Sequence, residues 1–177
     1  KKMFKKVKGA KELSQNLRAV FNYRIGFYQF GVFEDSGIKT LADLKGKRVF
    51  LGPPAAVQRV VAGGFVRAVT GLEPGKDYTV VKLGFSPAMQ AFQDRQLDVL
   101  VATSNPPASN FVQAALTSKI RFLGGEEADW EKPAMKKLMK IPGRTRGIIP
   151  PDVYGKNQAN EKPIHTVAAW VGLVTRK

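Results

Sequence analysis

Residues 77–103 read DYTVVKLGFSPAMQAFQDRQLDVLVAT, and they contain the clearest fold signature in the chain. The β-branched and aromatic run at 78–85 predicts a strand, and Ser86 followed by Pro87 is typical of a helix start. Residues 97–103 are almost entirely apolar, which predicts a strand buried on both faces of a sheet. A strand, a helix and a second strand with short connections indicate a βαβ unit with parallel strands.

The alternation of strand and helix extends on both sides of this unit. Upstream, residues 47–52 predict a strand, and 53–69 predict a helix with two prolines at its first turn. Downstream, 110–118 predict a helix and 120–124 predict a further strand. We therefore expect an α/β fold built on a doubly wound βαβ sheet.

The flanking segments depart from this alternation. The apolar residues of 11–22 fall on one helical face, which predicts a short amphipathic helix before a strand over 23–33. Beyond Gly125 the chain is polar and rich in proline and glycine, with one helix predicted over 133–140 and a last strand over 165–176. These features divide the chain into a connecting helix and strand (1–32), an α/β lobe (33–125) and a segment that leaves this lobe toward another structural unit (126–177).

The loops that follow the predicted strands are the candidate binding site. Ligands of open α/β sheets bind outside the carboxyl ends of the strands. A helix that starts there presents free backbone N–H groups and the positive end of its dipole, which favours an anion. Three strand ends meet this condition, and we expect their loops to form one polar rim. The candidate ligand-binding residues are Pro53, Pro54, Ala55, Ala56, Val57, Gln58, Ser86, Thr103, Ser104, Asn105 and Pro106.

The composition argues against most catalytic and metal chemistry. The chain has no cysteine, which excludes a disulfide framework, a thiolate zinc site and a cysteine nucleophile. His165 is the single histidine, and the sequence contains no nucleophile-elbow, zinc-protease or phosphate-loop motif. It also has no apolar run of about 18 residues, the length of a transmembrane helix. We therefore expect a protein that is not an enzyme and has no metal or cofactor.

The charge of the chain leaves another class of function open. The formal net charge is +15, with the excess in 1–32 and 106–177, and the run 132–146 contains no acidic residue. Such a surface is either the solvated face of a basic protein or a binding site for nucleic acid or an anionic membrane. A polyanion-binding module is therefore one alternative, and an enzyme on the same fold is another.

Three blocks of the sequence carry a family resemblance. They read SGIKTLADLKGKRVFLGPP at 36–54, DYTVVKLGFSPAMQAFQDRQLDVLVAT at 77–103 and HTVAAWVGLVTR at 165–176. Together they resemble the TAXI family of solute receptors, which serve tripartite ATP-independent periplasmic (TRAP) transporters. The resemblance spans 35–176, and the first block is its most specific part. It implies a type II periplasmic-binding-protein-like lobe plus part of a second lobe. On this resemblance, 1–32 would be a remnant of the first lobe, 33–125 the α/β ligand-binding lobe and 126–177 the return segment toward the first lobe.

The same resemblance implies a receptor that closes on a small solute. The expected ligand is an anionic or polar solute, such as an amino acid or a dicarboxylate. The expected partners are the membrane permease subunits of a TRAP transporter, and the expected location is periplasmic. The lobes would close about hinges near 28–33 and 124–126. Since much of the first lobe has no counterpart in this sequence, the exposed half-cleft also predicts a homodimer.

The first block departs from the family pattern at the expected ligand contact. After Gly-Pro-Pro, family members usually have Gly-Ser-Gly-Thr, whose hydroxyl and backbone amide groups hold ligand oxygens. The corresponding residues here are Ala55, Ala56, Val57 and Gln58. The hydroxyl donors are lost, and the side-chain amide of Gln58 favours a more neutral polar ligand.

Overall fold

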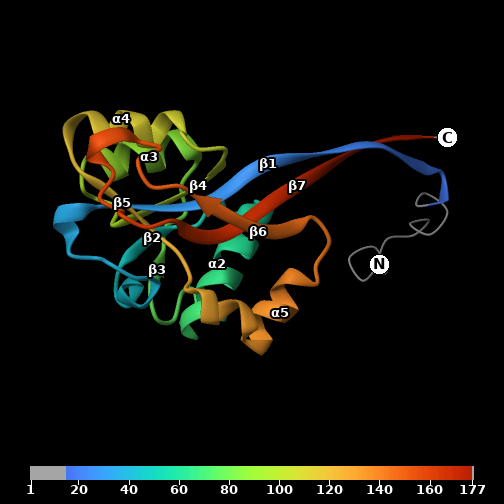
Figure 1. Cartoon of the computed structure of the whole chain (residues 1–177), viewed down its shortest axis with the longest axis horizontal. Coiled ribbons are helices and arrows are strands. Elements are labelled where there is room, and N and C mark those ends of the chain that lie inside the picture. Colours follow the sequence, from blue (N-terminus) through green and yellow to red (C-terminus); the bar gives the residue numbers. More distant parts are fainter. Residues whose placement is uncertain (1–14, 177) are drawn as a thin grey trace.

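A seven-stranded mixed sheet forms the centre of the protein in a computed structural model that describes residues 15–176. The strands lie in the order β3-β2-β4-β1-β7-β6, and β5 also pairs with β1 (Figure 1). Their bounds are β1 Leu17–Phe33, β2 Arg48–Phe50, β3 Thr79–Val80, β4 Val99–Ser104, β5 Ile120–Leu123, β6 Arg144–Ile149 and β7 Ile164–Arg176.

The predicted parallel core is present, and antiparallel strands extend it. Val49 of β2 lies opposite Val80 of β3 and Val99 of β4, in parallel register on both sides. By contrast, β1 is antiparallel to β4, β5 and β7, so that Phe30 lies opposite both Val101 and Leu123. The predicted α/β fold class is confirmed.

Helices cover both faces of the sheet (Figure 1). One core packs α2 and α5 against the sheet, and a second packs α3 and α4 against the opposite face. Among the described residues, no helix is both long and apolar enough to span a membrane. The helix bounds are α2 Val57–Thr70, α3 Phe85–Gln93, α4 Ser109–Thr117 and α5 Pro133–Met139, and shorter 3-10 helices span Glu34–Ser36, Leu41–Leu44, Glu127–Glu131 and Gly155–Asn157.

The predicted helix over 11–22 is wrong for residues 17–22. Residues 17–22 belong to β1, whose register with β7 runs from Leu17 opposite Arg176 to Phe27 opposite Ala168. The aromatic and β-branched residues of this segment favour a strand once a partner strand is present. Positions 11–14 of that prediction lie outside the described residues.

Three further predictions need correction. Helix α2 begins at Val57 instead of 53, because Pro53 and Pro54 lie in a turn in which the Ala56 N–H donates to the Pro53 carbonyl (3.0 Å). The strand predicted at 78–85 is reduced to the two residues of β3, which pairs with the three-residue β2. Ser86 is not the cap of α3, because Gly84 occupies that position. Strand β6, in the basic segment, has no counterpart among the predicted elements.

Strands β1 and β7 extend beyond the rest of the sheet as a two-stranded ribbon, which we call the β1–β7 arm (17–25 and 170–176; Figure 1). The arm carries large apolar side chains on its surface, which is unusual for water-exposed strands. The homodimer predicted through the exposed half-cleft stays a prediction. The exposed apolar residues are Leu17, Val20, Phe21, Tyr23, Ile25, Trp170, Leu173 and Val174.

A charged cluster joins the end of β1 to β5. Arg121 donates from Nε to Glu34 Oε2 (2.6 Å) and from Nη2 to Glu34 Oε1 (3.0 Å), and Lys39 also donates to Glu34. The hydrogen bonds from Arg121 are the main cause that lowers the pKa of Glu34, to about 2, against a desolvation effect that raises it. This bidentate pair therefore stabilises the fold only while Glu34 is ionised.

We expect acid to weaken this cluster. Because the folded-state pKa of Glu34 is about 2 and its usual value is 4.5, its contribution is complete above pH 4.5 and is lost as the pH falls toward 2. Glu34→Gln should lower the free energy of unfolding at neutral pH by about 1–3 kcal/mol and flatten its pH dependence in this window. The control is Glu131→Gln, since Glu131 forms a far more exposed pair with Lys136. Urea unfolding at several pH values measures both, and equal slopes for wild type and E34Q would contradict the prediction.

Candidate functional site

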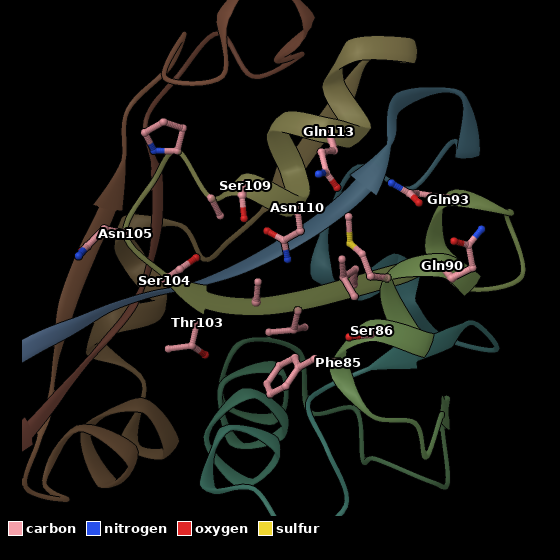
Figure 2. A pocket seen from close by; sticks show the side chains of 16 residues that line it. Phe85, Ser86, Gln90, Gln93, Thr103, Ser104, Asn105, Ser109, Asn110 and Gln113 are labelled. Carbon is pink, nitrogen blue, oxygen red and sulfur yellow. The ribbon is translucent and has the colours of Figure 1, made fainter.

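A cavity of about 670 Å³ lies between α3, α4 and the carboxyl end of β4 (Figure 2). Its apolar walls include Phe85 and Met89 of α3 and Leu100 of β4. Its polar lining consists of side chains that carry an amide or a hydroxyl group. The amides belong to Gln90, Gln93, Asn105, Asn110 and Gln113, and the hydroxyls belong to Ser86, Thr103, Ser104 and Ser109.

The structure places four of the predicted site residues on this cavity and seven outside it. Ser86 of α3 and the consecutive residues Thr103, Ser104 and Asn105 at the end of β4 line it. Pro106 and the segment 53–58 do not. The single polar rim expected from three strand ends is therefore assembled from two of them.

Gln58 has a structural contact in place of the expected ligand contact. Its side-chain Nε2 donates to the carbonyl oxygen of Val101 in β4 (2.8 Å). Its aliphatic atoms lie beside Gly52, where an added Cβ would approach them to 3.1 Å. Gln58 thus ties the start of α2 to the strand beneath the cavity.

Sequence reasoning missed the amides on the two helices. Gln90 and Gln93 are three residues apart on α3, and Asn110 and Gln113 are three apart on α4. Residues at this spacing share a helix face. Polar pairs on two successive helices of the βα alternation were the available signal, and Figure 2 shows both pairs near the cavity.

Two helix starts also open onto the cavity. The caps of α3 and α4 are Gly84 and Ala108, and neither contributes a side-chain capping hydrogen bond. The first residues of both helices, Ser86 and Ser109 among them, line the cavity. Each start brings free backbone N–H groups and a partial positive charge to the site.

One hydroxyl of the lining is unsatisfied. Among the residues that the structure describes, the buried Oγ1 atom of Thr103 has no hydrogen-bond partner. A buried polar atom without a partner is rare in folded proteins. By the alternation of strand side chains, this one lies on the α2 face of β4, the face of Val99 and Val101. In the same range of residues, no cluster of three or more His, Asp and Glu side chains could hold a metal ion.

Comparison with known proteins gives the family. The sequence model of the NMT1-like family matches residues 4–177, almost the whole chain. The chain belongs to the NMT1-like family.

Solved structures similar to this NMT1-like chain are periplasmic binding proteins. The aliphatic sulphonate-binding protein SsuA from Escherichia coli is 24% identical, with a TM-score of 0.47 over 70% of this chain and 38% of SsuA. A TRAP solute-binding protein from Chromohalobacter salexigens, solved with bound (S)-(+)-2-amino-1-propanol, is 15% identical, with a TM-score of 0.40 over 99% of this chain and 39% of that protein. The chain thus spans about two fifths of the length of either protein.

A buried polar network supports the cavity wall of the NMT1-like chain. The Ala108 N–H at the start of α4 donates to the Tyr154 hydroxyl (2.9 Å), which in turn donates to Gln29 Oε1. Gln29 is fully buried in β1, and its Nε2 donates to the carbonyl oxygen of Ser104 (2.9 Å). Burial raises the pKa of Tyr154 to about 12, so its hydroxyl remains a neutral donor. The network holds both ends of the loop 104–108 against β1.

Proposed function

We propose that this chain is the solute-contacting lobe of an extracytoplasmic solute-binding protein, and that it is not an enzyme. One observation carries the proposal: amide and hydroxyl side chains from α3, α4 and the end of β4 converge on one cavity. Its position at the carboxyl end of a parallel strand is where open α/β sheets bind ligands. A cavity of several hundred Å³ with apolar walls and a few polar groups has the size and composition of a small-molecule site.

The more specific proposal is a receptor of TAXI type. The sequence blocks at 36–54, 77–103 and 165–176 support it, with the permease subunits of a TRAP transporter as the partners. A periplasmic location follows from the same proposal. The loop 53–58, where the block departs from the TAXI pattern, lies outside the cavity, and so the solute would contact α3 and α4 instead.

Closure on the solute would use the β1–β7 arm. Hinges at 28–33 and 124–126 are not supported, because 28–33 are buried between β4 and β5 and the Gly125 N–H donates to the His165 carbonyl (3.0 Å). The ladder between β1 and β7 shifts register between Arg24 and Gly26, where the arm leaves the body. A bulge of this kind is a place where a strand bends. We therefore place the hinge at this shift.

The polyanion alternative gains no support from the basic run 132–146. The acidic residues just before it pair with three of its cations. Asp129 pairs with Lys132 (2.6 Å), and Glu131 pairs with Lys136 (2.7 Å). Glu127 pairs with an arginine of β6, across the chain. These pairs reduce the local positive field that a phosphate backbone would meet.

Binding of small solutes tests the proposed function. We expect at least one member of a panel of sugars, polyols, amides, amino acids and organic acids to raise the thermal midpoint of the chain. Replacing two cavity amides together, Gln93→Ala with Asn110→Ala, should weaken that binding about tenfold or more, because each lost hydrogen bond contributes roughly 0.5–1.5 kcal/mol.

Gln96→Ala is the matched control for the cavity variant. Gln96 is an exposed glutamine just beyond α3 and outside the cavity lining. It should leave the affinity unchanged. Equal losses in the control and the cavity variant, or no stabilisation by any member of the panel, would overturn the proposal.

A further inference from the structure

The cavity lining is uniformly uncharged, although the protein as a whole is strongly basic. None of the sixteen residues that line the cavity, all within 15–176, has an acidic side chain, a basic side chain or an imidazole. We propose that the cavity selects an uncharged solute that carries several hydroxyl or amide groups, in preference to carboxylates and amines. This inference rests on the proposed solute-binding function and names the class of solute.

A carboxylate finds no counter-ion in this lining. A charge that loses its water without an opposite charge beside it is strongly disfavoured. The two helix starts compensate for a small part of this, since each supplies a partial charge that acts within its first turn. The net charge of +15 does not replace a local counter-ion, because exposed charges are screened over about 8 Å at physiological salt.

A residue of the lining is hydrogen-bonded to a carboxylate. The side-chain Nε2 of Gln90 donates to both carboxylate oxygens of Asp94, at 2.9 and 3.0 Å. This carboxylate lies just outside the cavity and opposes an anion within it. An amine is disfavoured for a different reason. The Asp94 carboxylate lies outside the cavity and already accepts from Gln90, no carboxylate belongs to the lining, and the first residues of α3 and α4 bring the positive ends of both helices to it.

A neutral polar solute can form hydrogen bonds with the uncharged side chains of the lining. The side chains of Gln93, Asn105 and Gln113 each have an amide that both donates and accepts, as the hydroxyl and amide groups of such a solute do. Phe85, which is half exposed at the edge of the cavity, offers an apolar surface for the carbon skeleton.

Calorimetric titration of the chain with matched probes tests the inference. One set is glucose, gluconate and glucosamine, and a second is nicotinamide and nicotinate. The neutral member of at least one set should bind ten times more tightly than its charged counterparts, at both low and high salt. Gln113→Lys should bring a cation to the exposed edge of the cavity and shift the preference toward the carboxylate by tenfold or more. Gln96→Lys adds the same charge outside the cavity and should leave the preference unchanged.

The outcomes separate the two proposals. If a carboxylate binds the wild-type chain more tightly than its neutral counterpart, the inference fails and the proposed solute-binding function stands. If no probe of either charge binds and the wider solute panel is also silent, both fail. A shift of preference in Gln96→Lys as large as that in Gln113→Lys would show that the whole protein's charge selects the solute, and it would also overturn the inference.

Discussion

Replacing Phe111 with alanine is expected to lower the free energy of unfolding by about 3–5 kcal/mol, the usual cost of removing a fully buried phenyl ring. Phe111 is fully buried on α4 and directly follows the cavity residue Asn110 in the sequence. Its ring contacts Phe122 edge-on, with centroids 5.1 Å apart, and also meets Phe92 and Tyr154 edge-on. The substitution removes these contacts together and leaves a void between α4 and the sheet.

A second substitution makes this prediction specific to one contact. A Cβ added at Gly31 would lie 2.2 Å from the Phe111 ring, and the three atoms nearest to it all belong to Phe111. Gly31→Ala alone should therefore destabilise the protein by about 1–3 kcal/mol through overpacking. In the Phe111→Ala background the same methyl enters the space left by the ring, so the double variant should be more stable than the sum of the two losses predicts. Strict additivity in urea unfolding would show that the two residues do not share that space.

The order of the central elements could be predicted because several local signals agree there. Proline and glycine bound the segments from β2 to β5, and apolar periodicity changes between strand and helix at the same positions. Helix α5 was also predicted, from Pro133 at its start. The α/β class therefore follows from local chemistry.

The long strand β1 could not be predicted from its own residues. Leu17 and Phe21 are four apart, as on a helix face, but Phe21, Tyr23 and Ile25 also alternate as in a strand. The ladder with β7, more than 140 positions away in the sequence, decides between the two patterns. Strand β6 was missed for the same reason, because its pairing with β7 organises a segment whose composition is typical of a loop.

The candidate site was predicted in part, since the rule about strand ends does not say on which face of the sheet each loop opens. The residues at the end of β4 and the start of α3 line the cavity. Segment 53–58 lies outside it because α2 packs on the opposite face from α3 and α4. The glutamines and asparagines of the helices acquire their role only when those two helices lie side by side on one face.

Gly26 lies at the hinge proposed at the base of the arm. We expect an added side chain to be especially costly at this position. Gly26 has φ 151° at the register shift of β1, and a Cβ there would lie 2.1 Å from the backbone carbonyl carbon of Ser104. Neither the chain at Gly26 nor the end of β4 can relieve that overlap by rotating a side chain. Gly26→Ala should therefore cost roughly 2–5 kcal/mol, from the combined effects of overpacking and a disfavoured φ.

Gly37→Ala separates the two causes of that loss. Gly37 also has a positive φ, 74°, but nothing lies within 4 Å of its added Cβ. It should lose about 1–2 kcal/mol, the usual cost of a left-handed conformation for alanine. If Gly26→Ala lowers the free energy of unfolding no more than Gly37→Ala does in urea unfolding, the backbone at Gly26 is not in close contact with the end of β4. Ser104, whose backbone the added Cβ would meet, also lines the cavity. If Gly26→Ala lowers the free energy of unfolding more than Gly37→Ala and also weakens solute binding, the base of the arm and the binding site are connected through this backbone contact.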